Sequence, residues 1–347
     1  MAQSLVWQKS NSLNWNPVKY SIGDLELESG ETITDCQISA CIHGKPSETL
    51  TNVVLIAASL GGNHRRLDFL IGPNRALDTN RYCVIATDAL GNGLSSSPSN
   101  SSLQPGLSFP KFSIRDMVAS QAKLLDHLTV SRIFCVIGAS MGGMQALQWG
   151  VSYPDRMDCL VALTPMARTS AWSQAITLIS RQLLTTDEGW KKGQISTETW
   201  RSWIALMQVI ACSTPTAISH NSLDDDLSKL LDTKLQSLMT NPPDPRDWIW
   251  QTVAYDHHDV GTTPGAGGTT VVALKTISVP ALIMAASGDL MNPESAAKWA
   301  SEHIPDCVYS EIPSEQGHQA ATSIRELEVG FMDDQIADFL NKYFVKL

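Results

Sequence analysis

The chain alternates short, continuous apolar runs with longer segments of helical periodicity. Continuous apolar runs occupy residues 53–58, 82–86, 133–137, 160–163 and 279–286. Parallel strands that are buried on both faces have this pattern. Apolar side chains recur at helical spacing over residues 114–128 and again over residues 293–303. Strands that alternate with helices predict an α/β fold with a mostly parallel central sheet, flanking helices and right-handed crossovers.

Two regions depart from this rhythm. Residues 22–42 alternate apolar and polar side chains around a turn at residues 28–31, which predicts an antiparallel hairpin. Residues 168–268 contain no comparable strand-like run and show helical spacing instead. This second region holds six of the ten tryptophans, Trp172, Trp190, Trp200, Trp203, Trp248 and Trp250. We therefore predict a core built from residues 1–167 and 269–347, with residues 168–268 inserted as a helical lid.

Composition narrows the class of protein. Hydrophobic residues make up 43% of the 347 residues, which is enough to bury a substantial core. The 25 Lys and Arg residues against 35 Asp and Glu residues give a net charge of −10, so nucleic acid and anionic membranes are not expected partners. Residues 1–9 lack the apolar segment of a signal peptide, and the seven cysteines include no CxxC pair. We expect a cytoplasmic protein that does not span a membrane and keeps its thiols free.

One motif has the spacing of an activated nucleophile. The apolar run at residues 133–137 leads into Gly138-Ala139-Ser140-Met141-Gly142, and an amphipathic segment follows it. The glycines allow a sharp turn from strand to helix, which raises the Ser140 hydroxyl above the sheet edge. A serine that caps a helix beside packing glycines is the alternative. The strand before the motif and the helix after it favour a nucleophile elbow.

A nucleophilic serine needs a base that is oriented by an acid, in the chain order Ser, Asp or Glu, His. Asp289 follows the apolar run at residues 279–286, and His318 follows a short strand predicted at residues 308–312. Both residues therefore lie just past the ends of strands, on the sheet edge that carries Ser140. We predict Ser140, Asp289 and His318 as the catalytic triad. Residues 256–259, Asp-His-His-Asp, have no spaced ligand set around them, so we expect a hydrogen-bonded cluster there and no metal site.

Acyl transfer also requires donors for a developing oxyanion. Two backbone N–H groups usually supply them, one from the residue after the nucleophile and one from the loop after an earlier strand. Met141 follows Ser140, and Leu60 lies in the Ser59-Leu60-Gly61-Gly62 loop after the run at residues 53–58. We therefore predict that the N–H groups of Leu60 and Met141 form the oxyanion hole.

With these residues placed, the chain resembles the homoserine O-acetyltransferase family of the α/β-hydrolase superfamily. The strongest resemblance covers residues 138–149 and the following Tyr153-Pro154-Asp155. Weaker matches are Leu60-Gly61-Gly62, Asp78-Thr79-Asn80-Arg81-Tyr82, Arg181-Gln182 and Gly317-His318. The resemblance implies an α/β-hydrolase fold with a lid, a covalent acyl-serine intermediate and a homodimer formed through the lids.

Two departures from the family pattern concern the substrate. The family has an aspartate directly after the catalytic histidine, where this chain has Gln319. Alignment of Ala205-Leu206-Met207 with the Ala-Arg-Met of the family places Leu206 where an arginine would bind the carboxylate of homoserine. The resemblance therefore implies that homoserine binds poorly here. Apolar side chains, namely Leu206, Met207, Met166 and Trp172, are instead predicted to contact the substrate together with Gln319; packing within the lid or a dimer interface is the alternative for the tryptophans.

The favoured function is hydrolysis of a small, fairly apolar ester or amide through an acyl-serine intermediate. The alternative is an O-acyltransferase that uses acetyl-CoA, or a related thioester, with an alcohol acceptor other than homoserine. A third hypothesis is a non-catalytic hydrolase-like protein that binds a small ligand. Neither enzyme requires a metal or a redox cofactor, and acetyl-CoA is the co-substrate only in the transferase.

Overall fold

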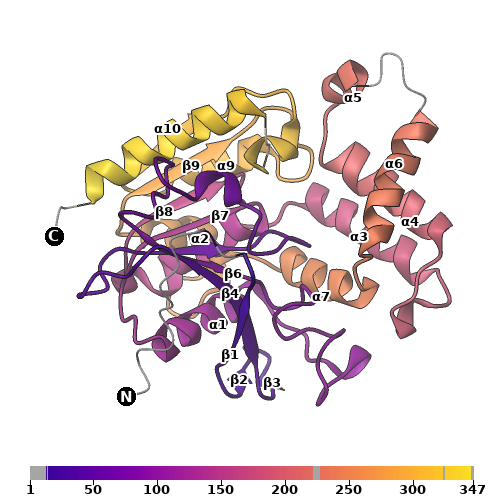
Figure 1. Ribbon diagram of the computed structural model, residues 1–347, viewed down its shortest axis with the longest axis horizontal. Coiled ribbons are helices and arrows are strands. Elements are labelled where there is room, and N and C mark those ends of the chain that lie inside the picture. Colours follow the sequence, from indigo (N-terminus) through magenta and orange to yellow (C-terminus); the bar gives the residue numbers. More distant parts are fainter. Residues whose placement is uncertain (1–12, 14, 222–226, 323–324, 345–347) are drawn as a thin grey trace.

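The computed structural model describes residues 13, 15–221, 227–322 and 325–344. Its centre is an eight-stranded sheet in the order β1-β4-β6-β5-β7-β8-β9-β10 (Figure 1). The strands are β1 (Val18–Ser21), β4 (Gln37–His43), β5 (Val53–Ala57), β6 (Cys83–Thr87), β7 (Ile133–Ala139), β8 (Met157–Leu163), β9 (Ala281–Ala285) and β10 (Cys307–Glu311). β4 pairs antiparallel with β1 and β6, and the pairs from β6 to β10 are parallel. The predicted α/β fold with a mostly parallel sheet is confirmed.

Every residue of β5, β6, β7 and β9 is buried, which shows that both faces of the sheet are covered. Alternate residues of β5 belong to different cores: Val53 and Leu55 lie in one hydrophobic cluster, Val54 and Ile56 in the other. Helices α1 (Ile114–His127), α2 (Met141–Ser152), α8 (Thr270–Lys275) and α9 (Glu294–Ser301) contribute to the first cluster. The long helix α10 (Glu326–Tyr343) covers the second cluster, along one face of the sheet in Figure 1.

The hairpin predicted at residues 22–42 is shorter than expected. Strands β2 (Leu25–Glu26) and β3 (Thr32–Ile33) form a small antiparallel pair around the predicted turn. The following residues leave this pair and form β4, where five of the seven residues are buried. Continuous burial explains the difference, because a strand covered on both faces gains more apolar contact inside the main sheet than in a two-stranded ribbon.

Between β8 and β9 the regular elements in the described residues are helices, and strand-like pairing is limited to a single bridge between Arg168 and Asp259. The elements are α3 (Ala171–Thr185), α4 (Thr197–Ile204), the π-helix η6 (Ala205–Ala211), α5 (Pro215–Asn221), α6 (Leu227–Thr240) and α7 (Pro245–Asp256). We call α3 to α7 the helical segment. It lies beside the core at one end of the molecule, where the carboxyl ends of the strands point (Figure 1).

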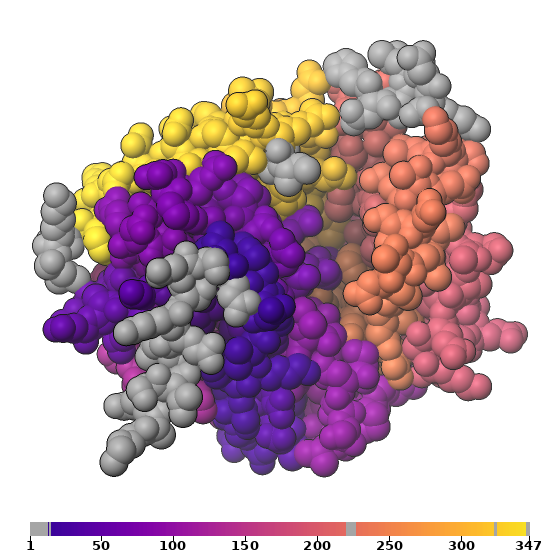
Figure 2. All heavy atoms as spheres, in the orientation of Figure 1, coloured from indigo at the N-terminus to yellow at the C-terminus, as the bar shows by residue number. Residues whose placement is uncertain are grey.

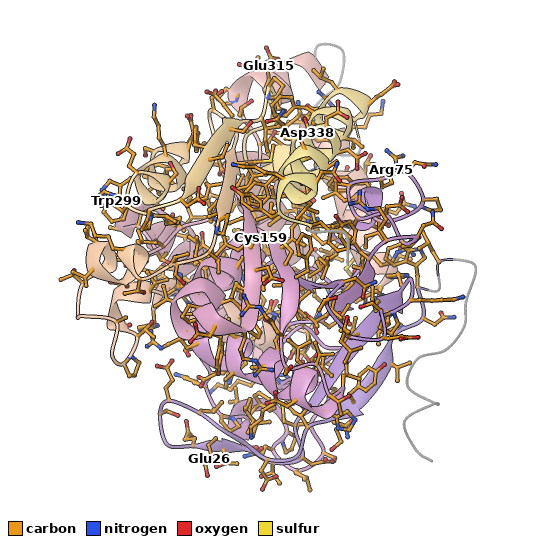
Figure 3. The ribbon with its side chains drawn as sticks, turned by 90° about the vertical axis from the view of Figure 1, so that its left-hand side faces the viewer. Glu26, Arg75, Cys159, Trp299, Glu315 and Asp338 are labelled. Carbon is orange, nitrogen blue, oxygen red and sulfur yellow. The ribbon has the colours of Figure 1, made fainter. Side chains whose placement is uncertain are left out.

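All seven cysteine thiols are free, as predicted. Five of them are buried, and Cys159 of β8 lies near the middle of the molecule in Figure 3. No helix in the described residues is both long and apolar enough to cross a bilayer. The expectation about a signal peptide concerns residues outside the described part.

Candidate active site

Ser140 lies at the turn between β7 and α2, in a backbone conformation that few side chains adopt. Its φ is +57° and its ψ is −122°, and its N–H donates to Leu163 O at 2.9 Å. The flanking glycines are needed for close approach: a Cβ on Gly138 would lie 2.3 Å from the carbonyl of Gly142, and a Cβ on Gly142 would lie 2.3 Å from Ala57 O. Residues held in such strained backbone conformations are concentrated at functional sites.

The three residues of the predicted triad form one hydrogen-bonded chain. Asp289 lies in the loop after β9, and His318 lies in the 3-10 helix η8 (Gly317–Thr322) after β10. His318 Nε2 is 2.8 Å from Ser140 Oγ, and His318 Nδ1 is 2.8 Å from Asp289 Oδ2. All three side chains are at least nine-tenths buried. This geometry lets Nδ1–H donate to the carboxylate while Nε2 accepts the proton of the serine hydroxyl.

A buried polar network holds the Asp289 carboxylate through the oxygen that does not contact His318. Its Oδ1 accepts from the backbone N–H groups of Met291, at 2.9 Å, and Asn292, at 2.8 Å. The Asn292 side chain donates to Thr164 O at 2.6 Å and accepts from the Tyr255 hydroxyl. Burial and then the charge of Asp289 raise the pKa of Tyr255 well above its ordinary value, so its hydroxyl stays protonated and donates.

Sequence reasoning did not find this network. Asn292 offered a weak signal, since it lies three residues after Asp289 in the same loop. Tyr255 offered none, because it reaches the site from α7, in a distant part of the chain.

Met141 directly follows Ser140, and the turn that carries Leu60 bonds through Ser59 to Ala139, the residue before Ser140. The N–H groups of Leu60 and Met141 donate no hydrogen bond within the part of the chain that the structure describes. Leu60 lies in a tight turn closed by the Gly62 N–H donating to Ser59 O at 2.9 Å, with Gly61 at φ +62°.

This turn is fastened to both the core and the helical segment. The Ser59 hydroxyl donates to Ala139 O at 2.8 Å, which ties the turn to the elbow. On the other side, the Gly61 N–H donates to the Gln251 side chain of α7 at 2.9 Å, and the same amide donates to Leu90 O. The turn that carries the Leu60 N–H is therefore fixed by β7 on one side and by α7 on the other, and an oxyanion hole requires such pre-organisation.

The residues predicted to contact the substrate have different surroundings. Met166 and Met207 are buried, and the Met166 sulfur accepts from the Ser173 hydroxyl at 3.5 Å. Leu206 is half-buried in η6. Trp172 is 56% exposed, and its indole N–H donates to Leu290 O, beside Asp289. Their roles toward a substrate stay predictions.

Gln319 joins the catalytic loop to the helical segment. Its backbone N–H donates to Cys212 O at 3.2 Å, and its side-chain amide donates to Gln208 O at 3.4 Å. An amide in this position offers no charge to an ammonium group. It also uses one of its donors to hold η6, so the residue contributes to the structure whatever it contacts in a substrate.

Three tryptophans of the helical segment stack edge to face next to the oxyanion turn. The ring centroids of Trp200 and Trp203 are 5.5 Å apart, and those of Trp203 and Trp248 are 4.8 Å apart. A Cβ on Gly61 would lie 3.1 Å from the Trp248 ring, so the indole packs directly on the turn. The stack packs the helical segment and contacts the turn through Trp248, and contact of these tryptophans with a substrate stays a prediction.

The acidic and histidine residues at 256–259 are used for hydrogen bonds. Asp256 pairs with Arg181 at 2.5 Å, and Asp259 accepts from the Thr270 hydroxyl at 2.9 Å. His258 is buried, and burial lowers its pKa to about 3. No group of three or more potential metal ligands occurs in the described residues.

Sequence reasoning overlooked a second buried His–Asp pair, in which His64 Nδ1 lies 2.9 Å from Asp88 Oδ2. Its other ring nitrogen faces Trp15 O at 3.2 Å, so both nitrogens donate when the ring is charged. Burial alone would lower the pKa of His64, but hydrogen bonding and charge from Asp88 outweigh it and raise the pKa to about 10. No serine hydroxyl bonds to this histidine in the described residues, so the pair has the form of a structural clamp.

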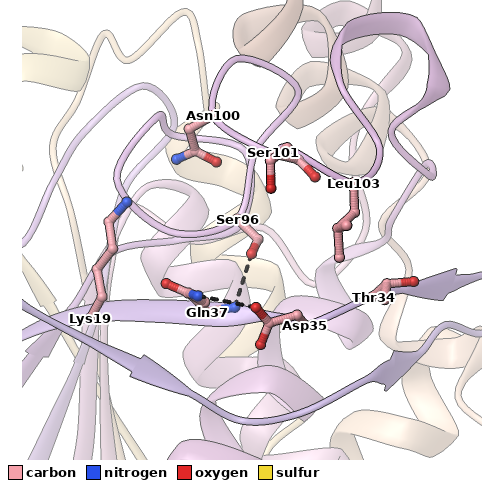
Figure 4. A pocket seen from close by; sticks show the side chains of 9 residues that line it. Lys19, Thr34, Asp35, Gln37, Ser96, Asn100, Ser101 and Leu103 are labelled. Atoms are coloured by element: carbon pink, nitrogen blue, oxygen red, sulfur yellow. Dashed lines mark hydrogen bonds between the residues drawn. The ribbon is translucent and has the colours of Figure 1, made fainter.

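A separate polar pocket of about 90 Å³ lies between β1, the start of β4 and the loop that follows β6 (Figure 4). Its lining includes Lys19, Asp35, Gln37 and Ser96, with the Gln37 N–H donating to Ser96 Oγ at 2.9 Å. It contains none of Ser140, Asp289 and His318. This pocket has no part in the chemistry of the triad.

Comparisons with known proteins agree with this geometry. A family model described as the alpha/beta hydrolase fold matches residues 52–321. The homoserine O-acetyltransferase of Methanosalsum zhilinae is 32% identical, over 93% of this chain and 72% of that protein. Two solved structures, the acetyl esterase MekB and an acetylester hydrolase from Corynebacterium glutamicum, are each 25% identical with a TM-score of 0.87, covering 94% of this chain and 97% and 96% of theirs. The chain therefore belongs to the homoserine O-acetyltransferase-like family of the α/β hydrolase fold.

Proposed function

We propose that this protein is a serine-dependent esterase that hydrolyses small, fairly apolar esters or amides, with the helical segment as its lid. The observation that supports the proposal most directly is the continuous chain from Ser140 Oγ through His318 to Asp289, with 2.8 Å at each hydrogen bond. The N–H groups of Leu60 and Met141, which bond to no other described residue, add the second requirement of acyl transfer beside that hydroxyl.

The chemistry follows the positions of these groups. As Ser140 Oγ attacks the carbonyl carbon, its proton passes to His318 Nε2, and the carbonyl oxygen becomes an oxyanion next to the N–H groups of Leu60 and Met141. Asp289 stabilises the imidazolium that forms. His318 then returns the proton to the departing alcohol or amine, which leaves an acyl-serine. Water then attacks the acyl-serine while His318 takes one of its protons. His318 returns this proton to Ser140 Oγ as the bond between Oγ and the acyl carbon breaks, which releases the carboxylic acid and restores the serine hydroxyl.

Water is the favoured acceptor because the contacts expected for homoserine are missing. Leu206 cannot pair with a carboxylate, and the neutral Gln319 amide already donates to Gln208 O. A charged group that is desolvated without its partner loses roughly 1.5–3 kcal/mol per hydrogen bond, so a zwitterionic acceptor is disfavoured. The two esterase structures with the same fold also support hydrolysis.

Acetyl transfer from acetyl-CoA to an alcohol other than homoserine is the second candidate. It is favoured by the homoserine O-acetyltransferase relatives, including the one that matches over 93% of this chain. The acyl-serine intermediate is common to both candidates, and only the acceptor in the second half-reaction differs.

A paired assay tests the proposal on one preparation. It follows release of chromophore from 4-nitrophenyl acetate, and consumption of acetyl-CoA with homoserine and with simple alcohols. We expect ester hydrolysis that falls about 10³-fold or more in Ser140→Ala. Ser29→Ala, at an exposed position of the hairpin turn, is the matched control and should keep full activity. Acceptor-dependent consumption of acetyl-CoA would select the transferase, and full activity in Ser140→Ala would refute both candidates.

A further inference from the structure

A buried glutamine bridges the two segments that carry the predicted oxyanion donors. Gln145 lies on α2, and its Nε2 donates to Ala58 O at 2.9 Å and to Met141 O at 3.2 Å. Met141 is one of the predicted donors, and Ala58 directly precedes the turn that carries Leu60, the other one. One amide nitrogen therefore contacts both segments.

Gln145 is the last member of a chain of buried side chains. Its Oε1 accepts from Gln121 Nε2 of α1 at 2.7 Å, and Gln121 Oε1 accepts from Trp149 Nε1 at 2.7 Å. An indole N–H can only donate and a backbone carbonyl can only accept, so the two ends of the chain fix the orientation of both amides. The Gln145 NH₂ group therefore faces the carbonyls of Ala58 and Met141.

Gln145 does not line the space that is open to a ligand. Its exposed fraction is 0%, whereas the surface of the molecule is hollowed between the core and the helical segment (Figure 2). Trp149, in the same chain of side chains, belongs to the first hydrophobic cluster. A buried amide costs free energy unless its hydrogen bonds are made, and an apolar side chain of similar size would avoid this cost. What the amide adds is a fixed distance between the two carbonyls that it holds.

We propose that Gln145 is a positioning residue of the oxyanion hole, which sets the distance between the N–H groups of Leu60 and Met141. Two donors stabilise an oxyanion only when both point to the place where the charge develops, and a displacement of about 1 Å can cost about 100-fold in rate. Without the amide, the end of β5 loses its bond to α2 and the turn shifts. This inference rests on the proposed function, because the oxyanion hole serves the acyl transfer proposed there.

Gln148 provides a matched control on the same helix. It is also buried, and its Nε2 donates to Ser152 Oγ at 2.8 Å and to Thr263 Oγ1 at 2.9 Å. Neither partner belongs to the segments that carry Leu60 and Met141. Gln148→Met therefore removes the same chemical groups as Gln145→Met and measures the cost of losing a buried amide from α2.

Steady-state hydrolysis of 4-nitrophenyl acetate tests the proposal. We expect Gln145→Met to lower kcat about 10- to 100-fold and to change KM less than about twofold, since the ester carries no oxyanion before the reaction. Gln148→Met should keep kcat within about twofold, although both variants should lower the melting temperature by similar amounts.

Gln145→Glu provides the test if Gln145→Met does not fold. Burial keeps its carboxyl group protonated, so it retains the acceptor and one of the two donors in nearly the same shape. Its kcat should still fall about threefold or more, with KM unchanged. Equal losses of kcat in the Gln145 and Gln148 variants, or an unchanged kcat in both Gln145 variants, would overturn the proposal.

A tetrahedral adduct separates this inference from the proposed function. 1,1,1-Trifluoroacetone forms a hemiketal when Ser140 Oγ bonds to its carbonyl carbon, the serine proton passes to His318 Nε2 and the ketone oxygen becomes an oxyanion. Fluorine NMR titration measures the dissociation constant of this adduct without turnover. Gln145→Met should raise it about 10- to 100-fold, and Gln148→Met less than about twofold.

The outcomes of the titration and of the hydrolysis assay are distinct. If the difference between the two variants persists while no ester is hydrolysed, the positioning role stands and the esterase is wrong. Equal dissociation constants in the wild type and Gln145→Met, or no adduct in the wild type, would refute the positioning role whatever the hydrolysis assay shows.

Discussion

At the scale of single residues, the nucleophilic role proposed for Ser140 depends on which nitrogen of His318 carries the proton. Asp289 Oδ2 accepts from Nδ1, which leaves Nε2 free to take the serine proton. The other carboxylate oxygen is fixed by two backbone N–H groups, so the orientation of Asp289 is set by its own loop. Asp289 therefore determines which tautomer of His318 is present.

Asp289→Asn tests this dependence. Its side-chain oxygen keeps the two backbone donors, so an NH₂ group faces His318 Nδ1 and forces the proton onto Nε2, where it blocks transfer from Ser140. We expect kcat to fall about 10⁴-fold, with KM and melting temperature almost unchanged. Stopped-flow and steady-state hydrolysis of 4-nitrophenyl acetate, with thermal unfolding by circular dichroism, measure these values. A loss of less than about tenfold would show that another group orients the histidine.

The meeting of Ser140, Asp289 and His318 was predictable because each follows a strand of the parallel part of the sheet, and parallel strands bring such positions to one edge. The supporting residues were not. Tyr255 and Gln251 reach the site from α7, and a contact between distant segments leaves no mark on local periodicity.

At the scale of elements, the junction between β5, β7 and α2 is packed backbone to backbone. Gly142 of α2 meets Ala57 at the end of β5, and Gly143 meets Leu163 at the end of β8, where added Cβ atoms would lie 2.3 and 2.8 Å from carbonyl oxygens. Backbone atoms cannot rotate away as side chains can. The distance between α2 and the sheet is therefore set by glycine.

Gly142→Ala should separate these elements. We expect a destabilisation of about 3 kcal/mol or more, together with reduced hydrolysis, because β5 carries the oxyanion turn. Gly330→Ala is the control: it is also a helical glycine, in α10, but an added Cβ there meets nothing within 4 Å, so it should stabilise by about 0.5–1 kcal/mol. Urea unfolding of both variants measures whether the free energy of unfolding decreases in Gly142→Ala and increases in Gly330→Ala. Equal effects would mean that the helical environment, and not the contact with Ala57, sets the response.

The sequence pattern predicted the strands whose residues are all buried. It did not predict the elements whose type or extent depends on tertiary contacts. The continuous apolar runs correspond to β5, β6, β7, β8 and β9. The hairpin prediction extended too far, into residues 37–42, because their alternation fits either an antiparallel ribbon or an antiparallel strand inside a large sheet, which is the position of β4. The π-helix at Ala205–Ala211 could not be predicted, because an α-helical and a π-helical turn share almost the same apolar spacing.

At the scale of the whole molecule, α7 joins the helical segment to the core through polar contacts at both of its ends. Gln251 bridges Gly61 and Leu90, and Tyr255 supports the loop of Asp289. At its beginning, Asp247 accepts from the backbone N–H and the hydroxyl of Ser99, in the loop after β6. A buried carboxyl group, that of Asp247, is thus one of the contacts between the helical segment and the core.

Burial raises the pKa of Asp247 from 3.8 to about 7, and the charge of Asp244 adds to this, while Ser99 and Arg246 act in the opposite direction. The folded state therefore binds this proton more tightly than the unfolded chain does. The resulting stability is present in full below about pH 4 and is lost as the pH rises toward about 7. Asp247→Asn cannot titrate, and its amide can still bond to Ser99 after the hydroxyl rotates. The melting temperature of the wild type minus that of the variant should therefore decrease steadily between about pH 5 and pH 8 in differential scanning calorimetry. A difference that stays constant or grows with pH would contradict the buried, proton-binding state of Asp247.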